Sequence, residues 1–259
     1  MDFLNKINEN PYEDLTWNIP EQPMGTINVV GGNAQSFRTS VKVAEYLSGK
    51  FPIKKINVVF PDALKNKLPP LDNFVFLPST DSGSFGDSEE LTELFKESDY
   101  NLVIGDLSKN SITAKALNHA YKNSTPCVIT RDSVDLFTEE SPEKTLMNEN
   151  LVLFGSMVEM QKLFRSVYYP KVLLISQSLM QVAEALHKFT LSYPVSLITL
   201  HNEQVLVAKN GQVNVVPLEK TGYAPLTIWN GELASKIVAM NLFNPDNFLD
   251  ATVAALFLR

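Results

Sequence analysis

The chain has 259 residues, of which 44% are hydrophobic, and a formal net charge of −7 at pH 7. This size can bury one large α/β core or two small ones, and one domain is the simpler arrangement. The acidic balance argues against nucleic acid or an anionic membrane as the main partner, since both favour clustered Lys and Arg. The single cysteine, Cys127, provides neither a disulfide framework nor a Cys-based metal site.

We expect no signal peptide in the first residues of this sequence. Residues 1–10 are polar and mixed in charge, and no apolar run is long enough to span a bilayer. We therefore expect a soluble, cytoplasmic protein. Three prolines among polar residues predict that residues 1–24 form an N-terminal arm with one short helix at 3–8, followed by a single α/β domain over 25–259.

Apolar runs and amphipathic segments alternate along the rest of the chain. The predicted strands are 26–30, 56–60, 74–77, 102–104, 126–130, 151–154, 172–175, 195–200, 204–208 and 212–216. The predicted helices are 37–47, 61–67, 89–97, 111–121, 134–137, 157–167, 178–189, 233–242 and 247–258. The turn at Asn210-Gly211 marks an antiparallel hairpin. The alternation predicts a mostly parallel sheet with right-handed crossovers.

The unit from 101 to 137 reads as strand, loop, helix and strand. In a parallel sheet, ligands bind at the carboxyl ends of the strands. Gly105, Asp106 and Asp132 follow the two strands of this unit and are therefore candidate site residues, although each loop also reads as an ordinary strand-to-helix turn.

A glycine turn follows the strand at 26–30. Gly31, Gly32 and Asn33 precede a helix whose first N–H groups can hold an anion, and glycine lets a ligand approach the backbone closely. The spacing is neither G-x-G-x-x-G nor a Walker sequence, so both standard phosphate loops are absent.

Four segments of the chain are similar in sequence to segments of one known family. Residues 126–137 are similar to a Pro-x-Val-x-Asp-Ala-Asp-Ala-Leu-Asn-Leu segment, with Asp132 at its second aspartate. Residues 151–163 parallel a Thr-Pro-His-Pro-Gly-Glu segment, with Glu159 at the glutamate. Residues 197–202 resemble a Val-Val-Leu-Lys-Gly strand, with His201 at the lysine and Asn202 at the glycine. Residues 229–235 stand in place of Gly-x-Gly-Asp-x-Leu-Ala-Gly, which puts Gly231 or Glu232 at the aspartate.

Taken in order from about 25 to 256, the chain resembles the ribokinase-like superfamily and, within it, the ADP/ATP-dependent NAD(P)H-hydrate dehydratases. The resemblance implies a three-layer α/β/α sandwich with a mostly parallel central sheet and a late β-hairpin. It also implies ADP or ATP, with Mg²⁺ as a possible companion ion, and an NAD(P)H-type substrate.

The resemblance also assigns roles to residues. Glu232 would be the catalytic base. The nucleotide would bind His201, Asn202, Trp229, Asn230 and Gly231. The substrate would bind Gly31, Gly32, Asn33, Gly105, Asp106, Asp132 and Glu159. The three histidines of the chain do not share a metal-like spacing, and no residue is assigned to a metal.

Two alternatives stay open. The family's Gly-Asp pair and several of its glycines are replaced here, which favours a non-catalytic descendant that keeps the fold to bind a nucleotide or a protein partner. The other alternative, a small-molecule kinase of the same superfamily, is disfavoured because the same aspartate is missing from this chain. Trp229 either stacks on an adenine or fills the core. Exposed edges near Phe74 or the hairpin permit a homo-oligomer.

Overall fold

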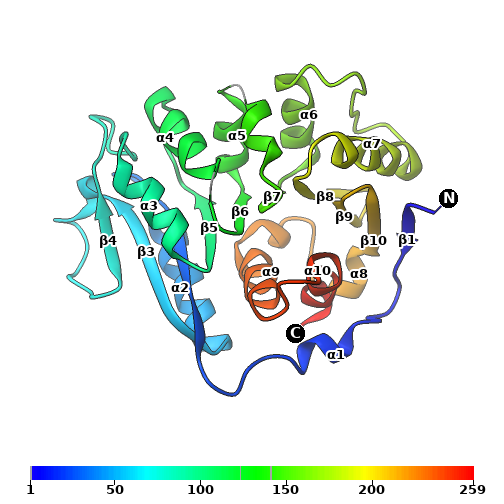
Figure 1. The fold of residues 1–259 in the computed structure, drawn as a ribbon, viewed down its shortest axis with the longest axis horizontal. Coiled ribbons are helices and arrows are strands. Elements are labelled where there is room, and N and C mark those ends of the chain that lie inside the picture. The colour runs from blue at the N-terminus through cyan, green and yellow to red at the C-terminus, as the bar shows by residue number, and fades with distance from the viewer. Residues whose placement is uncertain (1, 123, 141) are drawn as a thin grey trace.

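The computed structural model describes residues 2–122, 124–140 and 142–259, and these are built around one ten-stranded sheet (Figure 1). Its spatial order is β1-β10-β9-β8-β7-β6-β5-β2-β3-β4. The strands are β1 Leu4–Lys6, β2 Met24–Gly31, β3 Ile53–Pro61, β4 Phe74–Leu77, β5 Tyr100–Gly105, β6 Cys127–Thr130, β7 Leu151–Phe154, β8 Ser196–His201, β9 Gln204–Lys209 and β10 Gln212–Pro217. In this sheet only β9 runs antiparallel to its neighbours β8 and β10.

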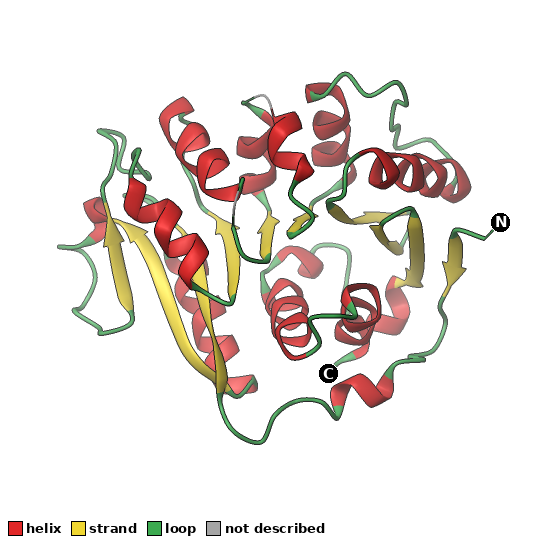
Figure 2. Ribbon diagram, viewed as in Figure 1, coloured by secondary structure: helices red, strands yellow, loops and turns green. Residues whose placement is uncertain are grey.

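Helices cover both faces of the sheet (Figure 2). The α-helices are α1 Glu13–Thr16, α2 Arg38–Lys50, α3 Glu89–Glu97, α4 Ser111–Tyr121, α5 Asp132–Thr138, α6 Met157–Ser166, α7 Leu179–Ser192, α8 Leu218–Thr221, α9 Glu232–Phe243 and α10 Phe248–Phe257. Short 3₁₀ turns lie at η1 Asp62–Leu64, η2 Pro142–Met147 and η3 Thr227–Trp229.

Two hydrophobic clusters occupy the spaces between the sheet and its helices. In one cluster, the helices α3, α4, α5, α6 and α7 pack against one face of the sheet. In the other, α2, α8, α9 and α10 pack against the opposite face. Successive strand residues alternate between the clusters, as Val29 and Val30 do on β2. The predicted three-layer α/β/α sandwich with a late hairpin is therefore confirmed.

The helices α3 and α4 each begin with a side chain that caps the N-terminus. Ser88 accepts a hydrogen bond from the backbone N–H of Glu90 at the start of α3, and Asn110 accepts one from Ile112 at the start of α4. Both helices have the predicted bounds.

Two predicted elements are wrong. Residues 3–8 contain no helix; instead β1 pairs parallel to β10, and Asn5 Nδ2 donates to Asn214 Oδ1 at 3.1 Å. Residues 172–175 form no strand, because Leu173 alone of this apolar run enters the core while Val172 and Ile175 are exposed. The short helix predicted at 61–67 is reduced to the 3₁₀ turn η1.

A buried ladder of amides crosses the centre of the sheet. Asn57 Nδ2 on β3 donates to Asn28 Oδ1 on β2 at 2.9 Å, and Asn28 Nδ2 donates to Asn101 Oδ1 on β5 at 3.0 Å. Asn101 Nδ2 in turn donates to the Phe95 carbonyl and to Thr125 Oγ1. The amides of Asn28 and Asn101 are thereby hydrogen-bonded through both the nitrogen and the oxygen, as burial requires.

Within the described part of the chain, the helices are too short or too polar to cross a membrane.

Candidate functional site

The loops at the carboxyl ends of β2 and β5 are joined by one backbone and one side-chain hydrogen bond. Gly32 N–H donates to the Gly105 carbonyl at 3.0 Å, and Asn33 Nδ2 donates to the Asp106 carbonyl at 2.6 Å. Gly32 and Gly105 have φ values of 96° and 94°, a region that favours glycine. The structure thus brings the predicted residues Gly31, Gly32, Asn33, Gly105 and Asp106 together at one edge of the sheet.

Asp132, the first residue of α5, holds the loop after β5 in place. Its Oδ1 and Oδ2 accept the backbone N–H groups of Asp106 and Leu107, both at 3.1 Å. A Cβ at Gly105 would lie 2.0 Å from Asp132 Oδ1, so this close approach requires glycine. Burial raises the pKa of Asp132, against the lowering effect of the two hydrogen bonds. Asp132 therefore orients the loop of Asp106.

Arg131 is a site residue that our sequence analysis did not select. Its backbone has φ 58° and ψ −143°, a conformation rarely adopted by residues other than glycine. The guanidinium lies 3.4 Å from Asp106 Oδ1, while Asp106 Oδ2 is buried without a hydrogen-bond partner in the described residues. The signal available in the sequence was a cation directly after an apolar strand that ends at the binding edge.

Two adjoining pockets open beside Arg131. One has a volume of about 380 Å³ and is lined by Asp106, Arg131, Asp132, Ser156, Glu159 and Trp229. The other, of about 560 Å³, is lined by Thr39, Lys42, Val43, Tyr46, Arg131, Leu226, Trp229, Asn230 and Glu232. Arg131 and Trp229 border both pockets, and we call the two together the carboxyl-edge cleft.

Glu232 begins α9 and already has three donors. Its Oε1 accepts from the hydroxyls of Tyr46 at 3.3 Å and Tyr223 at 3.2 Å, and it lies 3.2 Å from Lys236 Nζ. Burial, and then the negative charge of Glu232, raise the pKa of Tyr46 to about 12 and also raise that of Tyr223. Lys236 is buried and also donates to the Leu258 carbonyl. These contacts hold the Glu232 side chain in place at the wall of the cleft.

The turn before α9 is shaped by packing and by its own side chains. Gly231 has φ 96°, and a Cβ there would lie 2.6 Å from Val43 Cγ2, so glycine is required. Asn230 Oδ1 accepts the N–H of Glu232 at 2.9 Å. One of the N–H groups that a helix start offers to an anion is therefore used internally.

Trp229 packs against the core and also lines the cleft. Its ring centroid lies 5.0 Å from that of Phe154 at the end of β7, with 37° between the planes. The indole is half-buried and also borders both pockets of the cleft. It packs on the core with one part and faces the cleft with another.

Glu159 lies in the cleft but has a structural role as well. It forms a capping box with Ser156 at the start of α6, in which Ser156 N–H donates to Glu159 Oε2. Burial raises the pKa of Glu159 despite these hydrogen bonds.

His201 and Asn202 are not among the residues that line the cleft. They lie at the β8–β9 turn, where Asn202 has φ 47°. His201 is buried, and its Nε2 lies 2.8 Å from the Gln177 carbonyl, which can only accept a hydrogen bond. Nε2 therefore carries the hydrogen of this bond, and the ring is held inside the connection to α7.

No group of three or more His, Cys, Asp or Glu side chains within residues 2–122, 124–140 and 142–259 is placed to hold a metal ion.

Comparison with solved structures identifies the fold. A hypothetical protein from Streptococcus mutans matches with a TM-score of 0.65 at 14% identity, over 95% of this chain and 86% of that one. A ribokinase-like superfamily protein from Enterococcus faecalis matches with a TM-score of 0.67 at 12% identity, over 99% and 86%. The protein therefore has the ribokinase-like fold.

Another matching structure is that of a named enzyme. It is the ADP/ATP-dependent NAD(P)H-hydrate dehydratase from Bacillus subtilis, co-crystallised with ATP/Mg²⁺ and soaked with CoA, and it matches with a TM-score of 0.63 at 13% identity over 97% of this chain and 86% of that one. No protein-family model and no curated protein matches the sequence. The likeness to the dehydratase is a likeness of fold.

Proposed function

We propose that the carboxyl-edge cleft binds ADP or ATP. The observation that carries this proposal is the position of Arg131, whose strained backbone holds a guanidinium between the two pockets of the cleft. Strain of this kind costs about 1–3 kcal/mol and is typical of functional sites. The ATP/Mg²⁺ complex of the B. subtilis relative supports the choice of ligand.

The residues around the cleft suit the parts of a nucleotide. Arg131 and Lys42 offer two cations to the phosphates, and a guanidinium binds phosphate oxygens in bidentate fashion. Trp229 offers an indole surface on which a base can stack. Where Mg²⁺ accompanies ATP, Asp106 Oδ2, which has no hydrogen-bond partner in the described residues, would be the nearby oxygen ligand of the kind that Mg²⁺ prefers. His201 and Asn202, suggested by the family resemblance, are not needed for this arrangement.

Binding is tested by calorimetric and thermal-shift titration with ADP, ATP and AMP. We expect Arg131→Gln to weaken ADP binding by about tenfold or more, as the loss of one charge-assisted hydrogen bond predicts. Arg165→Gln, at an exposed position on α6, is the matched control and should leave the affinity unchanged. Absence of ADP and ATP binding, or equal affinities for the two variants, would overturn the proposal.

A second candidate function is the nucleotide-driven dehydration of hydrated NAD(P)H, with Glu232 as general base. It is favoured by a carboxylate that begins α9, lines the cleft and keeps a side chain that is 36% exposed. The contacts of Oε1 with Tyr46, Tyr223 and Lys236 oppose it, because this oxygen already has partners within the protein before a substrate binds.

Turnover separates this candidate from a non-catalytic descendant. Glu232→Gln should abolish the dehydration of hydrated NADH, and Glu219→Gln, an exposed substitution on α8, should not. ADP binding by the wild-type protein without turnover would instead support a non-catalytic nucleotide-binding protein.

A further inference from the structure

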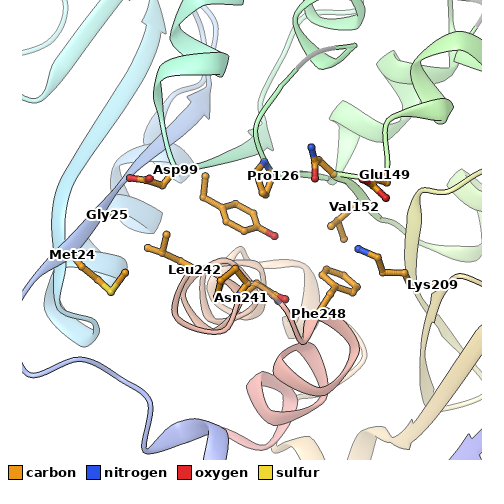
Figure 3. A pocket seen from close by; sticks show the side chains of 13 residues that line it. Met24, Gly25, Asp99, Pro126, Glu149, Val152, Lys209, Asn241, Leu242 and Phe248 are labelled. Atoms are coloured by element: carbon orange, nitrogen blue, oxygen red, sulfur yellow. The ribbon is translucent and has the colours of Figure 1, made fainter.

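A second pocket lies at the opposite edge of the sheet from the cleft (Figure 3). It has a volume of about 340 Å³ and lies between the amino ends of β2, β5, β6 and β7 and the helices α9 and α10. Apolar side chains form most of its wall, including Tyr100, Val152, Leu242 and Phe248. We call it the amino-edge pocket. None of its lining residues belongs to the carboxyl-edge cleft.

The wall of this pocket contains an unpaired buried oxygen. Asn241 is 4% exposed, and its Nδ2 donates to the Ile237 carbonyl at 2.8 Å and to Thr252 Oγ1 at 3.0 Å. Because a carbonyl can only accept, the atom facing Ile237 must be the nitrogen. Asn241 Oδ1 is thus left without a hydrogen-bond partner in the described residues. Figure 3 shows this oxygen on the side of Phe248 and Lys209.

An unsatisfied buried acceptor is unusual and costs about 1–3 kcal/mol. A ligand that presents an N–H or O–H group to Asn241 Oδ1 would remove that cost. The same site would discriminate against analogues that lack the donor, because they leave the oxygen unpaired.

The cation of the pocket is Lys209, the last residue of β9. Its Nζ lies 4.6 Å from the centre of the Phe248 ring, a cation–π contact. In the part of the chain that the structure describes, no carboxylate forms an ion pair with Lys209. An anionic group on a ligand would therefore gain a charge-assisted hydrogen bond here.

Two carboxylates limit the charge that the pocket accepts. Asp99 and Glu149 also line it, and Asp99 Oδ2 accepts the backbone N–H of Thr26 at 2.7 Å. They disfavour dianions and polyphosphates, so nucleotides are poor ligands for this pocket. A single negative charge directed at Lys209 meets the least repulsion.

We propose that the amino-edge pocket binds a small aromatic monocarboxylate that carries an N–H or O–H donor. The carboxylate pairs with Lys209, the ring packs against Tyr100 and Phe248, and the donor bonds to Asn241 Oδ1. The site is independent of the nucleotide site proposed above, because the two share no residue.

Three probes test the proposal on the full chain by ligand-observed NMR and thermal shift. Indole-3-acetate carries the ring, the donor and the carboxylate; 1-methylindole-3-acetate lacks the donor; and indole lacks the carboxylate. We expect indole-3-acetate to bind best and each analogue to bind about tenfold more weakly, the loss of one hydrogen bond of the charge-assisted or buried kind. This comparison tests Asn241 without altering the core of α9.

Variants locate the binding. Lys209→Gln should weaken indole-3-acetate about tenfold and leave indole unchanged, as the loss of one charge-assisted hydrogen bond predicts. Lys220→Gln, exposed on α8, is the matched control, and Arg131→Gln in the cleft should also have no effect. Absence of binding, equal binding of all three probes, or equal binding by Lys209→Gln and the wild-type protein would overturn the proposal.

Discussion

Polar side chains at the two edges of the sheet differ in how fully they are hydrogen-bonded within the protein. At the carboxyl edge, Asp132, Glu159 and Glu232 are held by backbone N–H groups, by a helix start and by tyrosine hydroxyls. At the amino edge, Asn241 Oδ1 is buried without a partner in the described chain, and Lys209 lies over an aromatic ring. The three carboxylates at the first edge are held in place before a ligand arrives, although Asp106 Oδ2 has no partner in the described chain, whereas the second edge leaves both its amide oxygen and its cation for a ligand to use.

The amides of the chain show the same contrast at a smaller scale. Asn101 has partners on both its nitrogen and its oxygen, while Asn241 has partners on the nitrogen alone. A fully paired amide stabilises the fold, and a half-paired one is a candidate binding group.

The largest expected effect comes from breaking the paired amide. Asn101→Ala removes the acceptor of Asn28 and Ser98 and the donor to Phe95 and Thr125. Because several buried groups lose their partners at once, we expect a loss of about 3–5 kcal/mol in the free energy of unfolding. Chemical denaturation measures it. A loss of less than about 1 kcal/mol, the net value of a single hydrogen bond, would show that the ladder adds little.

The next largest effect is expected at the carboxyl edge. Asp132→Ala leaves the N–H groups of Asp106 and Leu107 without their acceptor, and we expect a loss of about 2–3 kcal/mol in the free energy of unfolding. Asp135→Ala, three residues along the same helix, removes a partly exposed ion pair with Lys162 and should cost about 0–1 kcal/mol. Equal losses for the two variants would contradict the role given to Asp132.

The pH dependence of stability tests the environment of Asp132 separately. Its pKa is raised above 3.8 in the folded protein, so the folded state binds this proton more tightly than the unfolded chain does. Its contribution to stability is fully present below pH 3.8 and is lost as the pH rises through the raised value. The stability of the wild-type protein relative to Asp132→Asn should therefore fall as the pH rises above 3.8. Parallel denaturation profiles would contradict this.

A smaller effect is expected from neutralising Glu232. In Glu232→Gln the buried Lys236 loses its ion pair but keeps the Leu258 carbonyl, so we expect a loss of about 1 kcal/mol in stability. The pKa of Tyr46, raised to about 12, should fall but stay above 10, because burial is its main cause. Spectrophotometric titration of the tyrosines measures this, with Tyr46→Phe to assign the transition. An unchanged titration would show that the charge of Glu232 does not reach Tyr46.

The smallest effect, and the one of opposite sign, is expected at Arg131. Arg131→Gly relieves the strain of φ 58° and should stabilise the protein by up to about 1 kcal/mol, while it removes the cation of the proposed nucleotide site. Arg131→Ala removes the same guanidinium and keeps the strain. The difference in stability between the two variants isolates the backbone effect. A difference near zero would show that the backbone at Arg131 is not strained, and strain would then no longer support a functional site here.

Most of the fold could be predicted from local sequence patterns. The helices α3 and α4 were predicted from apolar spacing, and the β9–β10 hairpin from Asn210-Gly211; the structure adds that Ser88 and Asn110 cap the two helices. These signals lie within a few residues of the structure that they determine, so they can be read without knowing the rest of the chain.

The errors arose where distant contacts decide the structure. The strand β1 exists because β10 lies beside it, and nothing within residues 1–24 encodes that neighbour. The apolar run at 172–175 looks like a strand, but the connection between α6 and α7 leaves most of it exposed.

The location of the candidate site could be predicted from the sequence, but only some of its residues could. The sheet rule directed attention to the carboxyl ends, where Asp106 and Asp132 lie, and the family resemblance added Glu232. Arg131 was missed because its role depends on a backbone conformation, and the amino-edge pocket was missed because Lys209 and Asn241 meet only in three dimensions.

The pairing of β1 with β10 also constrains the order of events during synthesis. Asn5 and Asn214 are 209 positions apart, so the ribosome releases the first strand long before its partner exists. Until then β1 is an unpaired segment, because β10 is the last strand of the sheet in chain order. Once β1 is paired, it covers the edge of β10 and shields that strand from pairing with another chain.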